Sequence, residues 1–321
     1  MSEGTVTMPV RAQHRFDEAR LAAYLGDHLK DATGKLDVVQ FTYGQSNPTY
    51  LLRFPHGEYV LRKKPPGELL PSAHQIDREY RVQAALAKTD VPVAKPILYC
   101  EDSSIVGTPF YLMQYMQGRV FTDSALPGVS PGERHAMYLS LAATLGHLHR
   151  VDVEAVGLSD FGRPGNYYAR QIARWSRNFQ ATKTRDMADM ERLMDWLPRH
   201  VPEGEERATI VHGDYRFGNV MFHPREPRII AIFDWEISAL GHPLADLAHA
   251  AILYHTAPEE YWGVLGRDLA SEGIPTEDEF ETAYRRVTGR ADGLTPFHLA
   301  YALFRFAAIL DGVGARGLAG N

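Results

Sequence analysis

Two neighbouring stretches of this 321-residue chain decide its fold. Residues 210–222 read Ile-Val-His-Gly-Asp-Tyr-Arg-Phe-Gly-Asn-Val-Met-Phe, and residues 229–236 read Ile-Ile-Ala-Ile-Phe-Asp-Trp-Glu. An Asp five positions before an Asn is expected about once by chance in a chain this long, but the adjoining His-Gly lowers that expectation to roughly one in a thousand. A second Asp, Asp234, ends the following apolar run and makes the pattern more specific. Asp214, Asn219 and Asp234 are therefore the candidate functional residues.

Phosphoryl transfer is the chemistry that needs this set of groups. Mg²⁺ neutralises charge on a triphosphate while a carboxylate orients the acceptor hydroxyl and accepts its proton. Protein kinases place such an Asp five residues before a metal-binding Asn, and a later Asp supplies the second metal ligand. The spacing predicts Asp214 as the catalytic base and Asn219 and Asp234 as metal ligands. The alternative is that Asp214 and Asn219 cap a turn.

The chain before this region is rich in short β-type runs. β-Branched and aromatic residues between Gly-, Asn- and Pro-containing turns predict strands over residues 38–43, 49–54, 59–62, 96–100 and 110–115. Helical periodicity predicts helices over residues 16–30 and 73–88. This front part is expected to form a small antiparallel sheet with one helix after the leading one.

The rear part of the chain is mostly helical in pattern. Helices are predicted over residues 131–150, 167–180 and 187–197 and from Leu244 onward. The sequence therefore predicts an α+β fold with two lobes, residues 1–117 and residues 118–321. The hinge between them is expected at about residues 114–118.

Composition limits the class of protein. The 34 Lys and Arg residues against 40 Asp and Glu give a net charge of −6, which argues against a nucleic-acid partner. A single cysteine, Cys100, fits a reducing compartment. The chain has no apolar run of about 18 residues, so no membrane association is expected. Together with the polar start of the chain, these features predict a cytoplasmic protein and leave its oligomeric state open.

These motifs, in this order, resemble the aminoglycoside phosphotransferase family of small-molecule kinases, which has a two-lobed, protein-kinase-like fold. The resemblance implies ATP, with GTP left open, and Mg²⁺, and it implies a small-molecule hydroxyl as the acceptor. It assigns the nucleotide phosphates to the turn that contains Gly44, Ser46 and Asn47. Without the resemblance, this turn is an ordinary hairpin connection.

The resemblance also implies a phosphate-pairing cation on strand 59–62 and an acid that binds it. Arg62 stands at that position, and Lys64, on the same strand face, is the alternative. The expected partner is Glu79 on the following helix. Gln114 and Met116 lie in the run that resembles the hinge strand, whose backbone would pair with the adenine edge.

A later segment points to one subgroup of this family. Residues 241–248 read Gly-His-Pro-Leu-Ala-Asp-Leu-Ala, and they resemble the kinase-like domain that is fused to some acyl-CoA dehydrogenases. Asp246 within this segment is expected to hold the backbone of the catalytic loop rather than to act in catalysis. His212 is expected to organise the same loop from a buried position.

The helix predicted over residues 167–180 offers a candidate acceptor wall. Arg170 and Arg174 share one face of it, and Tyr167 and Tyr168 precede them. A solvated basic stripe over an apolar one is the plain alternative. A cationic face disfavours polycationic aminoglycosides and favours an anionic acceptor.

We therefore expect transfer to a hydroxyl of an anionic hydroxyacyl metabolite or its coenzyme A thioester. An aminoglycoside kinase and a non-catalytic nucleotide-binding scaffold are the alternatives. A protein kinase is disfavoured because no Ala-Pro-Glu-type segment follows Asp234.

Overall fold

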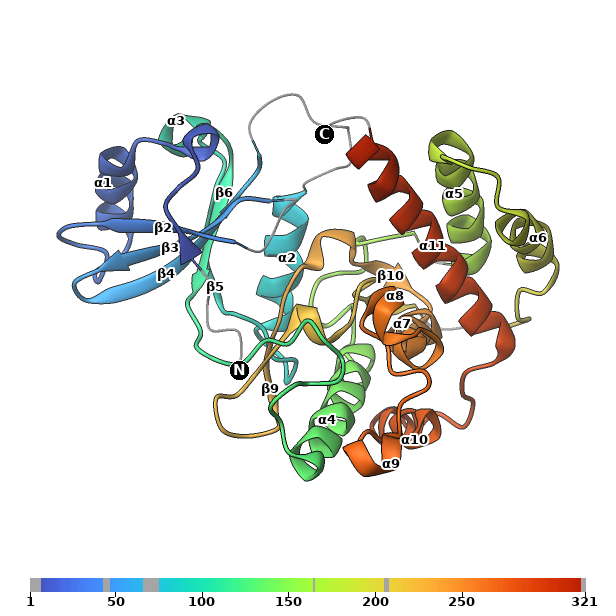
Figure 1. The fold of residues 1–321 in the computed structure, drawn as a ribbon. Coiled ribbons are helices and arrows are strands. Elements are labelled where there is room, and N and C mark those ends of the chain that lie inside the picture. The colour runs from blue at the N-terminus through green and yellow to red at the C-terminus, as the bar shows by residue number, and fades with distance from the viewer. Residues whose placement is uncertain (1–6, 43–46, 66–74, 164, 205–207, 319–321) are drawn as a thin grey trace. The chain divides into compact units, whose positions relative to one another are not determined.

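The structure is a computed structural model that describes residues 7–42, 47–65, 75–163, 165–204 and 208–318 (Figure 1). It divides into two compact units. We call residues 1–121 and 219–236 the sheet unit, and residues 122–218 and 237–321 the helical unit. The division differs from the predicted boundary at residues 117/118, because the segment 219–236 groups with the sheet unit.

The sheet unit contains a six-stranded sheet in the order β1-β2-β3-β4-β6-β5. All neighbouring strands in it are antiparallel. The strands are β1 (Thr7–Met8), β2 (Asp37–Phe41), β3 (Thr49–Phe54), β4 (Gly57–Lys63), β5 (Pro96–Cys100) and β6 (Phe110–Gln114). The predicted strands are confirmed, and only the short β1 gave no recognisable pattern in the sequence.

Helices pack on both faces of this sheet because side chains alternate along β4. Leu61 belongs to the cluster that buries Leu21 and Leu25 of α1 (Glu18–His28). Val60 belongs to the opposite cluster, which contains Ile76 of α2 (Ile76–Leu86). Arg62 has the same parity as Val60, so it is directed to the face that α2 covers. A short helix, α3 (Ser103–Val106), and a 3₁₀ turn, η1 (Ala12–His14), complete this part.

A hairpin from later in the chain joins the sheet unit through backbone hydrogen bonds. It consists of β8 (Val220–Phe222) and β9 (Ile229–Ile232). Arg119 and Phe222 exchange two backbone hydrogen bonds of 2.8 Å, and Ile232 N donates to Pro92 O at 2.9 Å. These long-range pairs explain why the segment groups with the sheet unit.

The helical unit is built around α7, all nine residues of which are buried. Its helices are α4 (Pro131–His149), α5 (Tyr167–Thr182), α6 (Ala188–Trp196), α7 (Pro243–Ala251), α8 (Pro258–Tyr261), α9 (Leu269–Glu272), α10 (Glu277–Thr288) and α11 (Pro296–Leu318). A two-stranded sheet pairs β7 (Thr209–Val211) with β10 (Ala239–Gly241). The short 3₁₀ turns are η2 (Leu197–Arg199), η3 (Phe217–Asn219), η4 (Trp235–Ile237) and η5 (Ile252–His255).

Helix α11 packs against both α5 and α7 (Figure 1). Its stretch Pro296–Ala315 is long and apolar enough to cross a membrane by length and composition alone, a test that core helices of water-soluble proteins also pass. Half of that stretch is buried within the protein, and it carries Tyr301 and Phe304 into the core cluster beside α5. The packing therefore accounts for its apolar composition.

Candidate active site

The sheet unit holds a buried ion pair at the position predicted for the phosphate-pairing cation. Nε of Arg62 lies 2.7 Å from Oε2 of Glu79, and Nη2 donates to Oε1 at 3.1 Å. Only 10% of the Arg62 side chain and 1% of the Glu79 side chain are exposed. Burial alone would lower the pKa of Arg62, but the charges of Glu79 and Asp234 outweigh it and raise that pKa. Arg62, rather than Lys64, is the partner of Glu79.

Asp234 lies within reach of the same guanidinium. Its Oδ1 accepts a hydrogen bond from Nη2 of Arg62 at 2.8 Å, and 37% of its side chain is exposed. Its backbone has a φ of +63°, in the left-handed region that non-glycine residues rarely adopt. Such strain persists where the surrounding structure holds it, and it is common at ligand sites. The Asp234 carboxylate is therefore both restrained by the protein and open to a ligand.

Further oxygen atoms gather around Asp234. Carboxylate oxygens of Glu79, Asp234 and Glu236 lie within 4.8 Å of one another. The amide of Asn47 donates to Glu79 at 3.0 Å and to Glu236 at 3.4 Å. The loop residue Asn47 therefore ties together two of the three acids.

Asn219 lies at the same end of the β8–β9 hairpin as Asp234. Its backbone carbonyl accepts a hydrogen bond of 2.8 Å from the N–H of Phe233, the residue directly before Asp234. Its side chain is buried. Mg²⁺ prefers carboxylate and carbonyl oxygens and holds few protein ligands alongside phosphate oxygens. Asp234 and Asn219 fit that donor set, so these residues could hold a magnesium ion.

The other residues predicted to contact the nucleotide do not all lie in described parts of the chain. Gly44 and Ser46 lie outside the described residues. Gln114 is the exposed last residue of β6, and its N–H donates to Lys95 O at 2.9 Å. Met116 is half-buried against the cluster that contains Met113, which is typical of core packing as much as of a nucleotide wall.

In the helical unit, Asp214 is held by two cationic or polar partners. Nε2 of His249 lies 3.0 Å from Oδ1, and Nε of Arg216 lies 3.4 Å from Oδ2. Burial opposes ionisation of this carboxyl. The hydrogen bond from His249 and the charges of His249, Arg216 and His212 outweigh that effect and hold the pKa of Asp214 well below its usual value. Asp214 is therefore a carboxylate at neutral pH, able to accept hydrogen bonds only.

The backbone of the loop that carries Asp214 is fixed from α7. Oδ1 of Asp246 accepts the N–H of Gly213 at 2.8 Å, and its Oδ2 accepts the N–H of His212. Gly213 has a φ of +86°, where a side chain would be strained, and an added Cβ would lie 3.1 Å from Ile237. Nδ1 of His212 accepts the N–H of Asp214 at 3.2 Å. Asp246 and His212 thus hold the loop as predicted.

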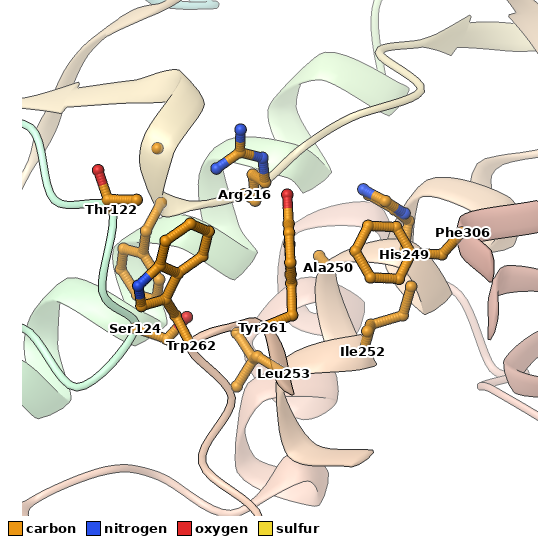
Figure 2. Close-up of a pocket in the computed structure, with 12 residues that line it drawn as sticks. Thr122, Ser124, Arg216, His249, Ala250, Ile252, Leu253, Tyr261, Trp262 and Phe306 are labelled. Atoms are coloured by element: carbon orange, nitrogen blue, oxygen red, sulfur yellow. The ribbon is translucent and has the colours of Figure 1, made fainter. Parts of the chain in front are cut away.

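A pocket in the helical unit lies beside the partners of Asp214 (Figure 2). Its lining includes Arg216, His249, Leu253, Tyr261, Trp262 and Phe306. The Tyr261 ring meets Phe306 edge-on at 4.4 Å, and the Arg216 guanidinium lies 5.9 Å from the Tyr261 ring centre. Figure 2 shows the Tyr261 hydroxyl pointing to the side where Arg216 and His249 lie. The pocket therefore combines an aromatic wall with polar groups next to Asp214.

The predicted acceptor residues on α5 divide into core and surface. Tyr168 is buried in a hydrophobic cluster, and its hydroxyl lies 3.2 Å from Nδ1 of His242, so it supports the core rather than a surface that a ligand reaches. Tyr167 is half-buried. Arg170 donates to the Arg163 carbonyl at 2.6 Å, whereas Arg174 is exposed.

Two neighbours of the predicted site could not be identified from the sequence alone. His249 stands between Ala248 and Ala250 in an otherwise apolar stretch, where a histidine is expected to be a core residue. Glu236 follows Asp234 by two residues, and this short separation is the sign in the sequence that its carboxylate lies near that of Asp234. Both were missed because their partners lie far away along the chain.

Known proteins support the same interpretation. A family model described as phosphotransferase enzyme family matches residues 37–284. Acyl-CoA dehydrogenase family member 11 of Rattus norvegicus is 44% identical over 324 residues, which cover 98% of this chain and 41% of that protein. The chain thus spans less than half the length of this relative.

Solved structures agree with that match. A proposed aminoglycoside phosphotransferase of Ralstonia eutropha JMP134 is 45% identical with a TM-score of 0.87, covering 96% of this chain and 91% of that one. The GDP complex of aminoglycoside 2'-phosphotransferase-IIIa is 15% identical with a TM-score of 0.64, covering 95% and 93%, and shares the fold. The fold is protein-kinase-like, and these likenesses support a kinase-type phosphotransferase. Since the family model matches most of its length, the chain belongs to the phosphotransferase enzyme family.

Proposed function

We propose that this protein transfers the γ-phosphate of a nucleoside triphosphate to a hydroxyl of a small anionic molecule. The favoured acceptor is a hydroxyacyl metabolite or its coenzyme A thioester. The observation that carries the proposal is Asp214, an ionised carboxylate held by His249 and Arg216, two residues that also line a pocket. ATP is the expected donor, with GTP as the alternative.

The nucleotide side of the reaction is assigned to the sheet unit. Arg62 presents a planar guanidinium that suits phosphate oxygens, and Glu79 fixes its orientation. Asn219 and Asp234 would hold Mg²⁺, which neutralises charge on the phosphates in this class of reaction. Nη2 of Arg62 donates a hydrogen bond to Asp234, so phosphate oxygens would compete with the Asp234 carboxylate for this Nη2 group of Arg62.

The acceptor side is assigned to the helical unit. Asp214 would accept a hydrogen bond from the acceptor hydroxyl and thereby orient its oxygen for attack. A carboxylate with so low a pKa is a weak base. This suits a loose transition state, in which the hydroxyl loses its proton late, after most of the bond to the leaving group has broken. His249 would keep the carboxylate in place while this proton moves.

The acceptor is proposed to be anionic because three arginines of the helical unit, one of them in the lining of the candidate pocket, offer positive charge to it. Arg216 lines the pocket itself, and Arg170 and Arg174 lie on α5 of the same unit. A polycationic aminoglycoside would meet like charge there. The match to an acyl-CoA dehydrogenase family member adds support for an acyl thioester, although that protein is more than twice as long as this chain.

An acceptor panel with Mg·ATP tests this proposal. Hydroxyacyl-coenzyme A thioesters, free hydroxy acids and kanamycin-like aminoglycosides would each be incubated with the protein, and ADP release would be measured. We expect turnover with an anionic acceptor, and turnover lowered by a factor on the order of 10²–10⁴ in Asp214→Asn. Turnover with aminoglycosides alone would overturn the acceptor class, and nucleotide binding with no turnover on any acceptor would favour a non-catalytic scaffold.

A further inference from the structure

Helix α11 carries a largely buried arginine that has no acid to pair with among the described residues. Arg305 is 8% exposed. Within the described ranges of the chain, no hydrogen bond or ion pair engages its side chain. Its guanidinium carbon lies 5.4 Å from the ring centre of the Trp175 indole on α5. Arginines this buried usually have an acid partner, so the guanidinium of Arg305, whose nitrogens still reach solvent, is open to an anion.

The groups around Arg305 are hydrogen-bond donors as well. Nε1 of Trp175 is buried and meets no acceptor among the residues that the structure describes. Arg174 brings a second guanidinium carbon within 5.4 Å of the same ring. The buried hydroxyl of Tyr301 is one turn of α11 away from Arg305, and Tyr167 is next to it. The cluster thus offers several donors and two positive charges.

One acid that acts on the same tyrosines, Asp246, does not compensate these charges. Asp246 acts electrostatically on Tyr167 and Tyr301, as Arg305 does. Its carboxylate, however, is already bound by the N–H groups of His212 and Gly213. It therefore cannot turn to Arg305 without releasing the loop that holds Asp214.

Helix α11 contributes residues both to this cluster and to the candidate acceptor pocket. Phe306, the residue after Arg305, lines that pocket and packs against Tyr261 and His249 at ring-centre distances of 4.4 Å and 6.0 Å. A ligand whose hydroxyl reaches Asp214 could therefore carry a second group toward Arg305. Donors and positive charge without acceptors match the chemistry of an oxyanion.

We propose that Arg305, Arg174 and Nε1 of Trp175 form a binding site for an oxyanion, either a carboxylate or a phosphate. In the transferase proposed above, on which this assignment rests, the site takes the anionic group of the acceptor. The planar guanidinium of Arg305 donates paired N–H groups to the anion. The indole of Trp175 packs against this guanidinium, and its Nε1 also donates to the anion. The anion supplies the missing counter-charge of Arg305.

Trp175 itself gives the readout of the test. The full-length protein is titrated with sodium sulfate and, separately, with sodium acetate, at an ionic strength kept constant with sodium chloride, while tryptophan fluorescence is recorded. The wild type should show a saturable change, and Trp175→Phe should lose it. In Arg305→Gln the half-saturating concentration should rise roughly 10- to 100-fold, the loss expected for charge-assisted hydrogen bonds.

Two further variants keep the result interpretable. Arg286→Gln removes the same charge from an exposed position on α10 and should titrate like the wild type. Arg305→Lys keeps the charge without the fork and should bind more weakly than the wild type but more tightly than Arg305→Gln. Circular dichroism establishes that each variant is folded.

Saturation by sulfate alone supports a phosphate group, and saturation by acetate alone supports a carboxylate. Saturation by neither anion, or equal titrations of Arg305→Gln and the wild type, would overturn the site. Asp214→Asn should bind the anion normally although its phosphate transfer is slowed. Failure of the anion site and failure of the proposed activity are therefore separate results.

Discussion

Nε2 of His249 lies 3.0 Å from Oδ1 of Asp214, closer than Nε of Arg216, which lies 3.4 Å from Oδ2. The imidazole is buried on α7, and its Nδ1 has no partner among the described residues. Since the carboxylate is ionised, Nε2 must carry the proton of this hydrogen bond. His249 therefore fixes one oxygen of Asp214 and leaves the other for Arg216 or a substrate hydroxyl.

Replacing Asp214 by Asn should lower kcat by a factor on the order of 10²–10⁴, the range for acid–base groups. The amide keeps the shape of the side chain but cannot accept the proton of the acceptor hydroxyl. Nucleotide binding, assigned to the sheet unit, should stay within about twofold of the wild-type value. Steady-state kinetics and isothermal titration with Mg·ATP measure the two effects, and unchanged turnover would remove Asp214 from its role.

Replacing His249 by Leu should lower kcat roughly 10- to 100-fold through misplacement of Asp214, with a smaller effect on KM. His249→Gln should recover part of this loss, because its amide N–H can still donate to Asp214. His255→Gln is the matched control, since His255 pairs with Glu277 instead. If His249→Leu and His249→Gln were equally impaired, packing rather than the hydrogen bond would explain the loss.

Replacing Asp234 by Asn should weaken the binding of Mg·ATP at least tenfold while leaving magnesium-free nucleotide binding little changed. The reason is the loss of a carboxylate ligand for the ion. Asp37→Asn, an exposed change on β2 in the same unit, controls for net charge. Titrations with and without Mg²⁺ measure both affinities, and an unaltered magnesium effect would refute the metal assignment.

Replacing Arg62 by Met should destabilise the protein by about 3–5 kcal/mol, because the buried Glu79 would lose its counter-charge. Adding Glu79→Gln to the same variant should restore much of that free energy of unfolding. Urea denaturation of the single and double variants measures this coupling. No recovery in the double variant would mean that the ion pair is not the source of the loss.

Lys63 should make stability depend on alkaline pH. Its ammonium donates to Val106 O, and burial lowers its pKa from 10.5 to about 8. Between these values the unfolded chain binds more protons than the folded chain, so the free energy of unfolding rises with pH. Relative to Lys63→Met, the wild type should gain about 1–3 kcal/mol from pH 8 to pH 10.5. Equal slopes in the two proteins would contradict this.

The spacing of residues along short segments predicted most of the strands and helices and identified the candidate acids Asp214 and Asp234. The strands and α2 follow from side-chain alternation and helical spacing, and the parity of Arg62 on β4 already directs it to α2 and Glu79. The β8–β9 hairpin could not be assigned to the sheet unit, because its partners Pro92 and Arg119 lie about a hundred residues earlier. Such pairing leaves no periodic signal.

The same limit applies to the buried polar residues. His249 and Arg305 each interrupt an apolar helical pattern by one residue, which sequence alone cannot distinguish from a tolerated core position. Only the distances to Asp214 and to Trp175 reveal what each contacts. Tyr168 shows the reverse case, since a residue beside a basic stripe proved to be core.

The most direct measurement follows the phosphorus atoms themselves. ³¹P nuclear magnetic resonance of the protein with Mg·ATP and a hydroxyacyl-coenzyme A thioester should show a new phosphate monoester signal that grows as the γ-phosphate signal of ATP declines, with ADP formed in equal amount. Formation of inorganic phosphate alone, or an unchanged ATP spectrum with every hydroxyl acceptor, would contradict the proposed transfer.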